Sequence, residues 1–287
     1  MKTMKKVMAF VDSAPSAFHV SDFAAWAALR LAAPLELLHV LDRHPEKAPS
    51  SDLSGSIGLG AQETLLQTLS ALDEKRSTLA QHHGRELLDA LTARVRQAGV
   101  TTVQSRQRHG SLVETLVDLQ AESGLFVFGQ NHPAEPGKKL HLDHHIEQAI
   151  RAVRRPVLVV PKRYRRPTSF AVAFDGSAKG RKMLEAVASS PLLRDLLCHV
   201  VMAGEESEAA CSHLAWARTF LGAAGVNGRV SFAPGEPERS LMTYLKAHAV
   251  DLLVIGAYGH SRLRQFIVGS TTTTLLRTSP VPVLVLR

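Results

Sequence analysis

The sequence predicts an α/β fold built as two tandem open sheets, each with five parallel strands and with helices on both faces. Short apolar runs alternate along the 287 residues with longer stretches whose apolar residues recur at helical spacing. Such alternation is typical of parallel strands joined by right-handed helical crossovers. The order of segments in the first half also returns in the second half, which indicates an internal repeat.

The first half supplies five expected strands and four expected helices. The strands are expected at 7–11, 35–40, 101–106, 125–129 and 156–160. The helices are expected at 17–31, 62–97, 112–122 and 143–153. Stretch 62–97 is either one long helix or two that break near Gly84, because glycine is a poor helix former. Residues 43–60 are rich in Pro, Ser and Gly, which predicts a surface loop.

The second half repeats this order after a linker near 161–168. Its strands are expected at 170–174, 196–200, 230–232, 252–255 and 282–286, and its helices at 179–188, 211–221, 239–248 and from about 270. Matching segments end the first strand of each half, at Asp12-Ser13 and at Asp175-Gly176-Ser177. We therefore expect two domains, at 1–162 and 167–287.

Composition limits the class of protein. Hydrophobic residues are 45% and charged residues 21%, which is typical of globular domains. No apolar run approaches the roughly 18 to 20 residues that span a bilayer, and the basic start lacks the apolar run of a secretory signal. The two cysteines, Cys198 and Cys211, favour a reducing compartment over a disulfide framework, so we expect a cytoplasmic protein without a membrane partner.

The net charge of +8 permits attraction to polyanions. The basic residues are mostly scattered, and the one cluster, Lys162-Arg163-Tyr164-Arg165-Arg166, lies between two prolines. Zinc-finger spacing, a basic region with heptads and an aromatic RNA-binding strand motif are all missing from the sequence. We therefore do not expect specific nucleic-acid binding.

The most informative stretch follows the fourth strand of the second half. Gly256 and Gly259 come directly after the apolar run at 252–255, and Gly269-Ser270 opens the next helix. Glycines let backbone approach a ligand closely, and the first turn of a helix presents unpaired N–H groups and the positive end of its dipole. The spacing differs from both the P-loop and the dinucleotide fingerprint. It predicts a phosphate site at the carboxyl end of a parallel strand.

This G-x2-G-x9-G-S spacing resembles the signature of the nucleotide-binding branch of the universal stress protein family. The resemblance extends over the whole chain, which looks like a tandem member of that family. It implies a Rossmann-like fold related to the adenine nucleotide α-hydrolases, and ATP as the ligand. The residues that we expect at the ATP site are Asp175, Val200, Gly256, Gly259, His260, Arg262, Gly269, Ser270 and Thr271.

The resemblance implies roles for the residues near the strand ends. Asp175 would approach the adenine, and the backbone at Val200 would contact the base where the second strand ends. Gly256 and Gly259 would pass beneath the ribose and phosphates. Each assignment has a structural alternative, since Asp175 equally suits a helix cap and Val200 is typical of a core residue.

The phosphates would lie at the helix start. There Gly269 and Ser270 would take the phosphate oxygens, and the hydroxyl of Thr271 would reach a phosphate or a bound Mg²⁺. His260 and Arg262 would add positive charge to the site. Solvated loop residues and ordinary polar residues at a helix start are the alternatives for these positions.

The first half departs from the pattern. Gly129 remains, but His132 replaces the second glycine, and Asp143-His144 stands where Gly-Ser is expected. A carboxylate there would cap the helix and repel phosphate. Two like charges about 4 Å apart cost about 4 kcal/mol at a surface-like dielectric, as much as millimolar binding is worth in total. We expect no ATP in the first half. His141, His144 and His145 lack a Cys or a paired carboxylate at ligand spacing, so we expect no metal site there.

Signatures of catalysis are missing from the sequence. It has no nucleophile elbow, HExxH, kinase set or Walker lysine. We therefore expect a nucleotide-dependent regulatory or sensor protein with at most slow ATP hydrolysis. The alternatives are a sensor or scaffold for another small ligand, and an adenine-nucleotide α-hydrolase or adenylating enzyme, whose SGGxDS and HxGH motifs the sequence lacks.

The last strands of the two halves are the expected contact between them. Single domains of the resembled family commonly dimerise through this strand. Strands 156–160 and 282–286 are both strongly apolar, and an exposed edge of this kind would aggregate. We expect them to pair within the chain as a pseudo-dimer, and the resemblance also allows two chains to associate as a homodimer.

Overall fold

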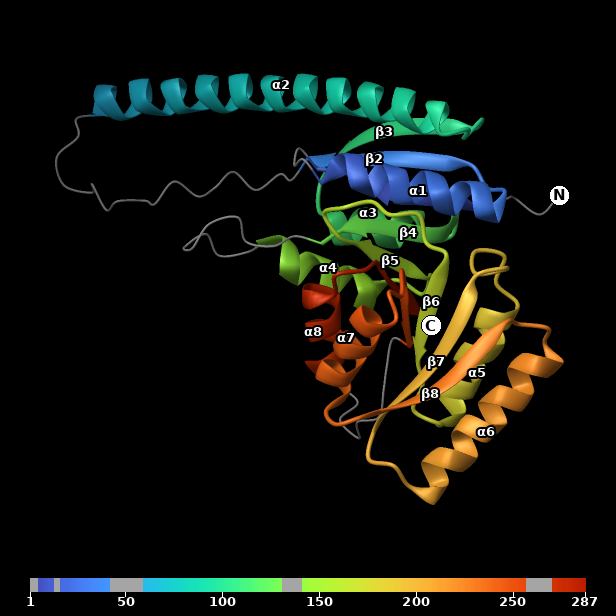
Figure 1. Ribbon diagram of the computed structural model, residues 1–287. Helices are drawn as coiled ribbons and strands as arrows, with labels where there is room; N and C mark the ends of the chain where they lie inside the picture. Colours follow the sequence, from blue (N-terminus) through green and yellow to red (C-terminus); the bar gives the residue numbers. More distant parts are fainter. Residues whose placement is uncertain (1–4, 13–15, 42–58, 131–140, 257–269) are drawn as a thin grey trace.

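A computed structural model describes residues 5–12, 16–41, 59–130, 141–256 and 270–287 (Figure 1). The strands are β1 (Lys6–Phe10), β2 (Leu35–Leu41), β3 (Val103–His109), β4 (Ser123–Gly129), β5 (Val157–Val160), β6 (Ser169–Ala173), β7 (Leu197–Gly204), β8 (Gly228–Pro234), β9 (Leu253–Gly256) and β10 (Val283–Leu286). The helices are α1 (Ala17–Leu31), α2 (Leu59–Gln97), α3 (Leu112–Leu119), α4 (His141–Ala152), α5 (Ala178–Ala188), α6 (Glu208–Ala223), α7 (Pro237–Ala247) and α8 (Ser270–Thr278).

All ten strands form one sheet, in the order β3-β2-β1-β4-β5-β10-β9-β6-β7-β8. Within each half the five strands run parallel, which confirms the predicted fold class. The halves join where β5 and β10 pair antiparallel, with Leu158 opposite Leu284. Both leucines are at most 1% exposed, so the pairing expected from the two apolar strands buries them at the middle of the sheet.

Helices cover both faces of the sheet. One core cluster packs residues of α1, α2, α5 and α6 against the strands, and the other packs residues of α3, α4, α7 and α8. Each face therefore receives two helices from each half. The first half is blue to green and the second yellow to red in Figure 1, with the β5–β10 junction between them.

The long helix α2 has 39 residues and continues through Gly84. A side chain at Gly84 would collide with Gln107 and would lie 2.6 Å from His39 Cδ2. Glycine here lets the helix approach β2 and β3 closely, and it does not break the helix. Of the two alternatives for this stretch, the single long helix is therefore the observed one.

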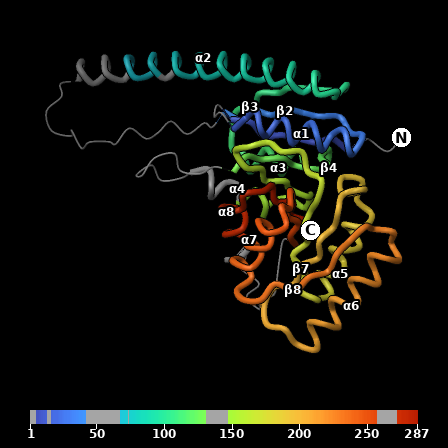
Figure 2. Tube along the Cα trace, in the orientation of Figure 1, coloured from blue at the N-terminus to red at the C-terminus, as the bar shows by residue number. Residues whose placement is uncertain are grey.

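The predicted apolar stripe of α2 is buried only in part. Leu88 and Leu91 are at most 4% exposed, whereas Leu69 and Leu79 are 45% and 70% exposed. The earlier part of the helix extends beyond the sheet (Figure 2). Helical periodicity therefore predicted the helix correctly but not how far the core supports it.

Further contacts tie the two halves together. Arg30 at the end of α1 donates from Nε to the carbonyl of Leu192 at 2.6 Å. Tyr164 of the linker packs edge-on against Phe23 of α1, with ring centroids 4.8 Å apart. In the parts of the chain that the structure describes, no helix is long and apolar enough to cross a membrane.

Candidate functional site

The predicted site lies where β6 and β9 end. These strands pair side by side, with Val172 opposite Val254. The chain leaves β6 through α5 to reach β7 on one side, whereas it reaches β9 on the other side from α7. Open α/β sheets bind ligands at the carboxyl ends of such strands, where the connections diverge.

Asp175 follows β6 at this edge and is exposed. Its Oδ1 accepts hydrogen bonds from the backbone N of Ser177 at 3.0 Å and from the Ser177 hydroxyl at 2.7 Å. Ser177 is the N-cap of α5 and accepts from the backbone N of Gly180 at 3.0 Å. Asp175 therefore organises the turn into α5 by holding Ser177, and Ser177 rather than Asp175 is the residue that caps the helix.

The turn is covered by aromatic and basic side chains that the sequence analysis missed. Gly176 has φ of +73°, and a side chain there would collide with His213 of α6. Arg181 of α5 lies over the Trp216 ring, 4.6 Å from its centroid. Trp216 stacks in turn on Phe174, with centroids 6.1 Å apart. Arg181 follows this turn closely in the sequence, but only the fold brings His213 and Trp216 of α6 against it, so sequence spacing gave no signal for the group.

The predicted position of Val200 is wrong. It was expected where the second strand ends, but it is the fourth residue of the eight-residue strand β7. Its neighbours are Val172 of β6 and Val230 of β8, and it is fully buried. β7 is longer than expected because residues 201–204 continue the ladder with β8. β7 pairs with β6 only as far as Val201, which lies opposite Ala173. Residues 202–204 of β7 therefore extend past the last residue of β6.

Gly256 ends β9, beside Leu286 of β10. A Cβ there would meet Met183 Sδ at 3.6 Å, an ordinary van der Waals distance. The described packing around Gly256 thus leaves room for a side chain. Gly129, its counterpart in the first half, differs because a Cβ there would lie 3.1 Å from Val20 Cγ2 of α1.

The helix predicted to receive phosphates begins where the motif places it. α8 starts at Ser270. Thr272 in its first turn is 8% exposed and therefore largely withdrawn from solvent. The side chains of Ser270 and Thr271 lie outside what the structure describes, as do the whole residues Gly259, His260, Arg262 and Gly269.

The corresponding region of the first half is described only in part. The backbone places Asp143 and His144 in the first turn of α4, which begins at His141. Their side chains and the whole of His132 lie outside the described residues. Gln130, directly after β4, is described and is 4% exposed.

Comparison with known proteins assigns the chain to a family. The model of the universal stress protein family matches residues 3–161 and 199–287. Universal stress protein Slr1230 of Synechocystis sp. is 34% identical over 287 residues, an alignment that covers 99% of this chain and 100% of that protein. The chain belongs to the universal stress protein family. A shorter relative, universal stress protein YxiE of Bacillus subtilis, is 33% identical over 63 residues, which are 22% of this chain and 43% of that protein.

Solved structures of universal stress proteins share the fold. One from Archaeoglobus fulgidus superposes with a TM-score of 0.67 at 17% identity, over 99% of this chain and 97% of the other. One from Pseudomonas aeruginosa gives 0.61 at 20% identity, over 99% and 93%. The second segment matched by the universal stress protein model begins at residue 199, so it contains Gly256 and Ser270 but not Asp175.

Strand β7 contains two buried titratable groups, His199 and Cys198. His199 Nδ1 lies 3.0 Å from the Tyr244 hydroxyl, which donates to Ser231 Oγ at 2.9 Å. Burial lowers the pKa of His199, and nearby His248 and Arg229 lower it further. Burial also raises the pKa of the Cys198 thiol to about 12. Both groups are therefore held uncharged at neutral pH within this universal stress protein.

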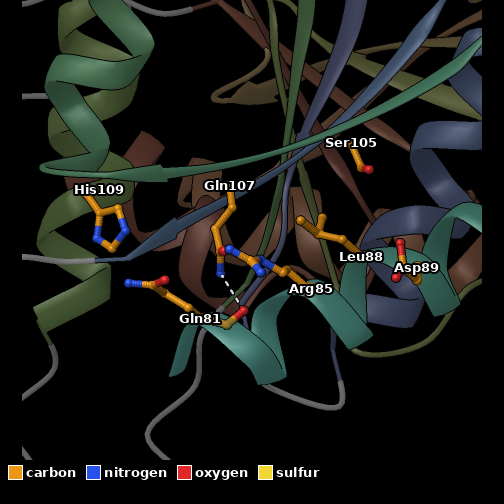
Figure 3. Close-up of a pocket in the computed structure, with 7 residues that line it drawn as sticks. All are labelled: Gln81, Arg85, Leu88, Asp89, Ser105, Gln107 and His109. Atoms are coloured by element: carbon orange, nitrogen blue, oxygen red, sulfur yellow. Dashed lines mark hydrogen bonds between the residues drawn. The ribbon is translucent and has the colours of Figure 1, made fainter. Parts of the chain in front are cut away.

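A separate open groove lies between α2 and β3 (Figure 3). Its lining residues are Gln81, Arg85, Leu88, Asp89, Ser105, Gln107 and His109. Gln107 Nε2 donates to the backbone carbonyl of Gln81 at 3.3 Å. The groove belongs to the first half and lies beside β3, an edge strand of the sheet, whereas β9 and β6 are interior strands of the second half. Among the described residues no group of three or more His, Cys, Asp or Glu could hold a metal ion.

Proposed function

We propose that this universal stress protein binds ATP in its second half and uses nucleotide occupancy as a regulatory or sensor signal. The adenine would lie near the Asp175 turn and the end of β7, and the ribose would pass over Gly256. The proposal is supported by two features that occur together, at the end of β9 and at the start of α8. Gly256 ends β9, where an added side chain would meet the described residues only at van der Waals distance, and α8 begins at Ser270 of the same motif.

The first turn of α8 supplies the expected phosphate contacts. A helix start offers unpaired N–H groups and about half a positive charge, and an anion there typically gains about 0.3–1 kcal/mol at an exposed site. α8 has no acidic residue in its first turn to compete with phosphate. Mg²⁺ usually keeps several waters and binds through substrate phosphates, so ATP would bring its metal with it.

The first half is proposed to bind no ATP in this way. At the end of β4 a side chain added to Gly129 would press on Val20, whereas one added to Gly256 would meet Met183 at an ordinary distance. Asp143 lies in the first turn of α4, where a carboxylate would repel phosphate.

The proposal is a binding function in the cytoplasm with at most slow hydrolysis. The cytoplasm supplies ATP and keeps thiols such as the exposed Cys211 reduced. Incubation of the protein with labelled ATP tests the claim about hydrolysis. Turnover well above about 1 per second, within the usual range of enzymes, would contradict it.

The double variant Gly259→Asp with Gly269→Asp tests the site itself. Two carboxylates near the expected phosphates should abolish ATP binding in calorimetry. Gly222→Asp makes the same chemical change on the exposed face of α6, where nothing lies within 4 Å of the added carbon, and should bind as the wild type does. ATP binding that survives the double change would place the site elsewhere. Mass spectrometry of the purified protein tests the alternative of another small ligand.

A further inference from the structure

Gln130 links the first half to the helix that is proposed to hold the phosphates. Its side-chain Nε2 donates to the carbonyl of Leu276, in the last turn of α8, at 2.8 Å and to that of Ser279, directly after the helix, at 3.1 Å. Its backbone N donates to the carbonyl of Val160 at 2.7 Å, which fixes Gln130 beside β5. Only the amino group of an amide can donate to two carbonyls, so these contacts also set the orientation of the side chain.

The sequence of α8 explains why this donor is needed. The last carbonyls of a helix lack partners within the helix. The carbonyl of Leu276 would normally accept from the N–H four residues later, but that residue is Pro280, which has none. Gln130 is only 4% exposed, so its amide replaces a partner at a place that water barely reaches. An unpaired buried carbonyl typically costs about 1–3 kcal/mol.

The second half makes the matching contact to the first. Arg287 donates from Nη2 to the carbonyl of Ile150, near the end of α4. Ile150 lies six residues before Pro156, as Leu276 lies six residues before Pro282. Each half therefore holds the last turn of the other half's final helix, across the β5–β10 junction. We call the Gln130 contact the α8 clamp and the Arg287 contact the α4 clamp.

The two clamps differ in function, because α8 is proposed to hold the phosphates and α4 is not. α8 has nine residues, a rigid rod of about 13 Å at 1.5 Å per residue. A rod of this length that is fixed at its last turn is also fixed at its first turn, where the phosphates are proposed to lie. We propose that Gln130 is a positioning residue of the second half's nucleotide site, through which the first half sets the placement of α8. This inference rests on the proposed function.

The same position shows how the two halves have diverged. In the second half, the residue after the strand-ending Gly256 is Ala257, which has no side-chain donor. In the first half, the residue after Gly129 is Gln130, whose amide is already used by α8. In the first half, the residue that follows the strand-ending glycine therefore contacts α8 of the second half.

Gln130→Met tests the clamp because methionine keeps the length of the side chain but cannot donate. Arg287→Met is the matched control, since it removes the α4 clamp and leaves the α8 clamp intact. We expect Gln130→Met to weaken ATP binding about 3- to 10-fold in calorimetry, and Arg287→Met to change it less than 2-fold. Gln130→Lys retains a donor whose charge suits a helix C-terminus, and should keep affinity within about 3-fold of the wild type.

Hydrogen exchange of the nucleotide-free protein supplies a readout that does not depend on ATP. Gln130→Met should speed exchange at the amides of α8, and Arg287→Met at those of α4. ATP affinity unchanged by Gln130→Met, equal losses in the two methionine variants, or unchanged α8 exchange would each overturn the inference. A wild-type protein that binds no ATP would overturn the proposed function, while α8 exchange would still decide whether the clamp exists.

Discussion

Replacing Gly256 with alanine separates a glycine kept for a ligand from one kept for packing. The added Cβ would meet Met183 Sδ at 3.6 Å, and Gly256 is not among the glycines with positive φ, so the fold accommodates it. Glycine within a strand is typically about 0.5–1 kcal/mol less favourable than alanine. We therefore expect Gly256→Ala to unfold at an equal or higher denaturant concentration than the wild type.

ATP binding should respond in the opposite direction. If the ribose and phosphates pass over this backbone, a methyl group takes their space. A loss of about 1.4 kcal/mol of binding free energy corresponds to a tenfold larger dissociation constant. We expect a weakening of about this size, with stability retained.

Gly129→Ala is the matched control in the first half. Its Cβ would lie 3.1 Å from Val20 Cγ2, which is tight for two carbon atoms, so α1 must shift. Such overpacking typically costs about 1–3 kcal/mol. We expect lower stability and unchanged ATP affinity, with calorimetry and urea unfolding as the two assays. Wild-type affinity in Gly256→Ala, or equal losses of affinity in both variants, would refute the reasoning.

Three other predictions concern the rest of the fold. The pKa of His199 is lowered in the folded protein. As the pH falls below the unfolded-state value of about 6.5, the unfolded chain takes up a proton at this histidine more readily than the folded chain, so the free energy of unfolding decreases. His199→Gln should flatten that decline in urea midpoints between pH 7.5 and 5.5, and an unchanged slope would contradict the assignment. The Thr168 hydroxyl donates to Asp251 Oδ2 at 2.7 Å, and Asp251→Ala removes this acceptor. The variant should lose about 2–3 kcal/mol of unfolding free energy, and a loss under about 0.5 kcal/mol would contradict this. A thiol reagent at neutral pH should modify the exposed Cys211 in the native protein and Cys198 only after unfolding, because burial raises the pKa of Cys198 to about 12; two reactive thiols in the native protein would argue against that burial.

Much of the fold follows from patterns that are local in the sequence. The alternation of apolar runs and helical stretches predicted parallel strands with crossover helices, and the repeat predicted two equivalent halves. The two proline-initiated apolar strands predicted the β5–β10 pairing, because neither can remain an exposed edge. The motif placed Gly256 at the end of a strand and Ser270 at the start of a helix, and both positions agree with the structure.

What the sequence could not predict depends on distant partners. β7 runs past Val200 because β8 continues beside it, and the length of a strand depends on its neighbours as well as on its own apolar run. Gly84 belongs within a helix because His39 lies against it. Gln130 reaches a carbonyl 146 residues away, which no spacing rule connects.

The most direct test of the account is a crystal structure of the protein with a non-hydrolysable ATP analogue and Mg²⁺, together with the stoichiometry of ATP binding in solution. We expect one nucleotide per chain, with its phosphates at the first turn of α8 and its base near the end of β6. Nucleotide density in the first half alone, or two equivalent ATP molecules per chain, would contradict it.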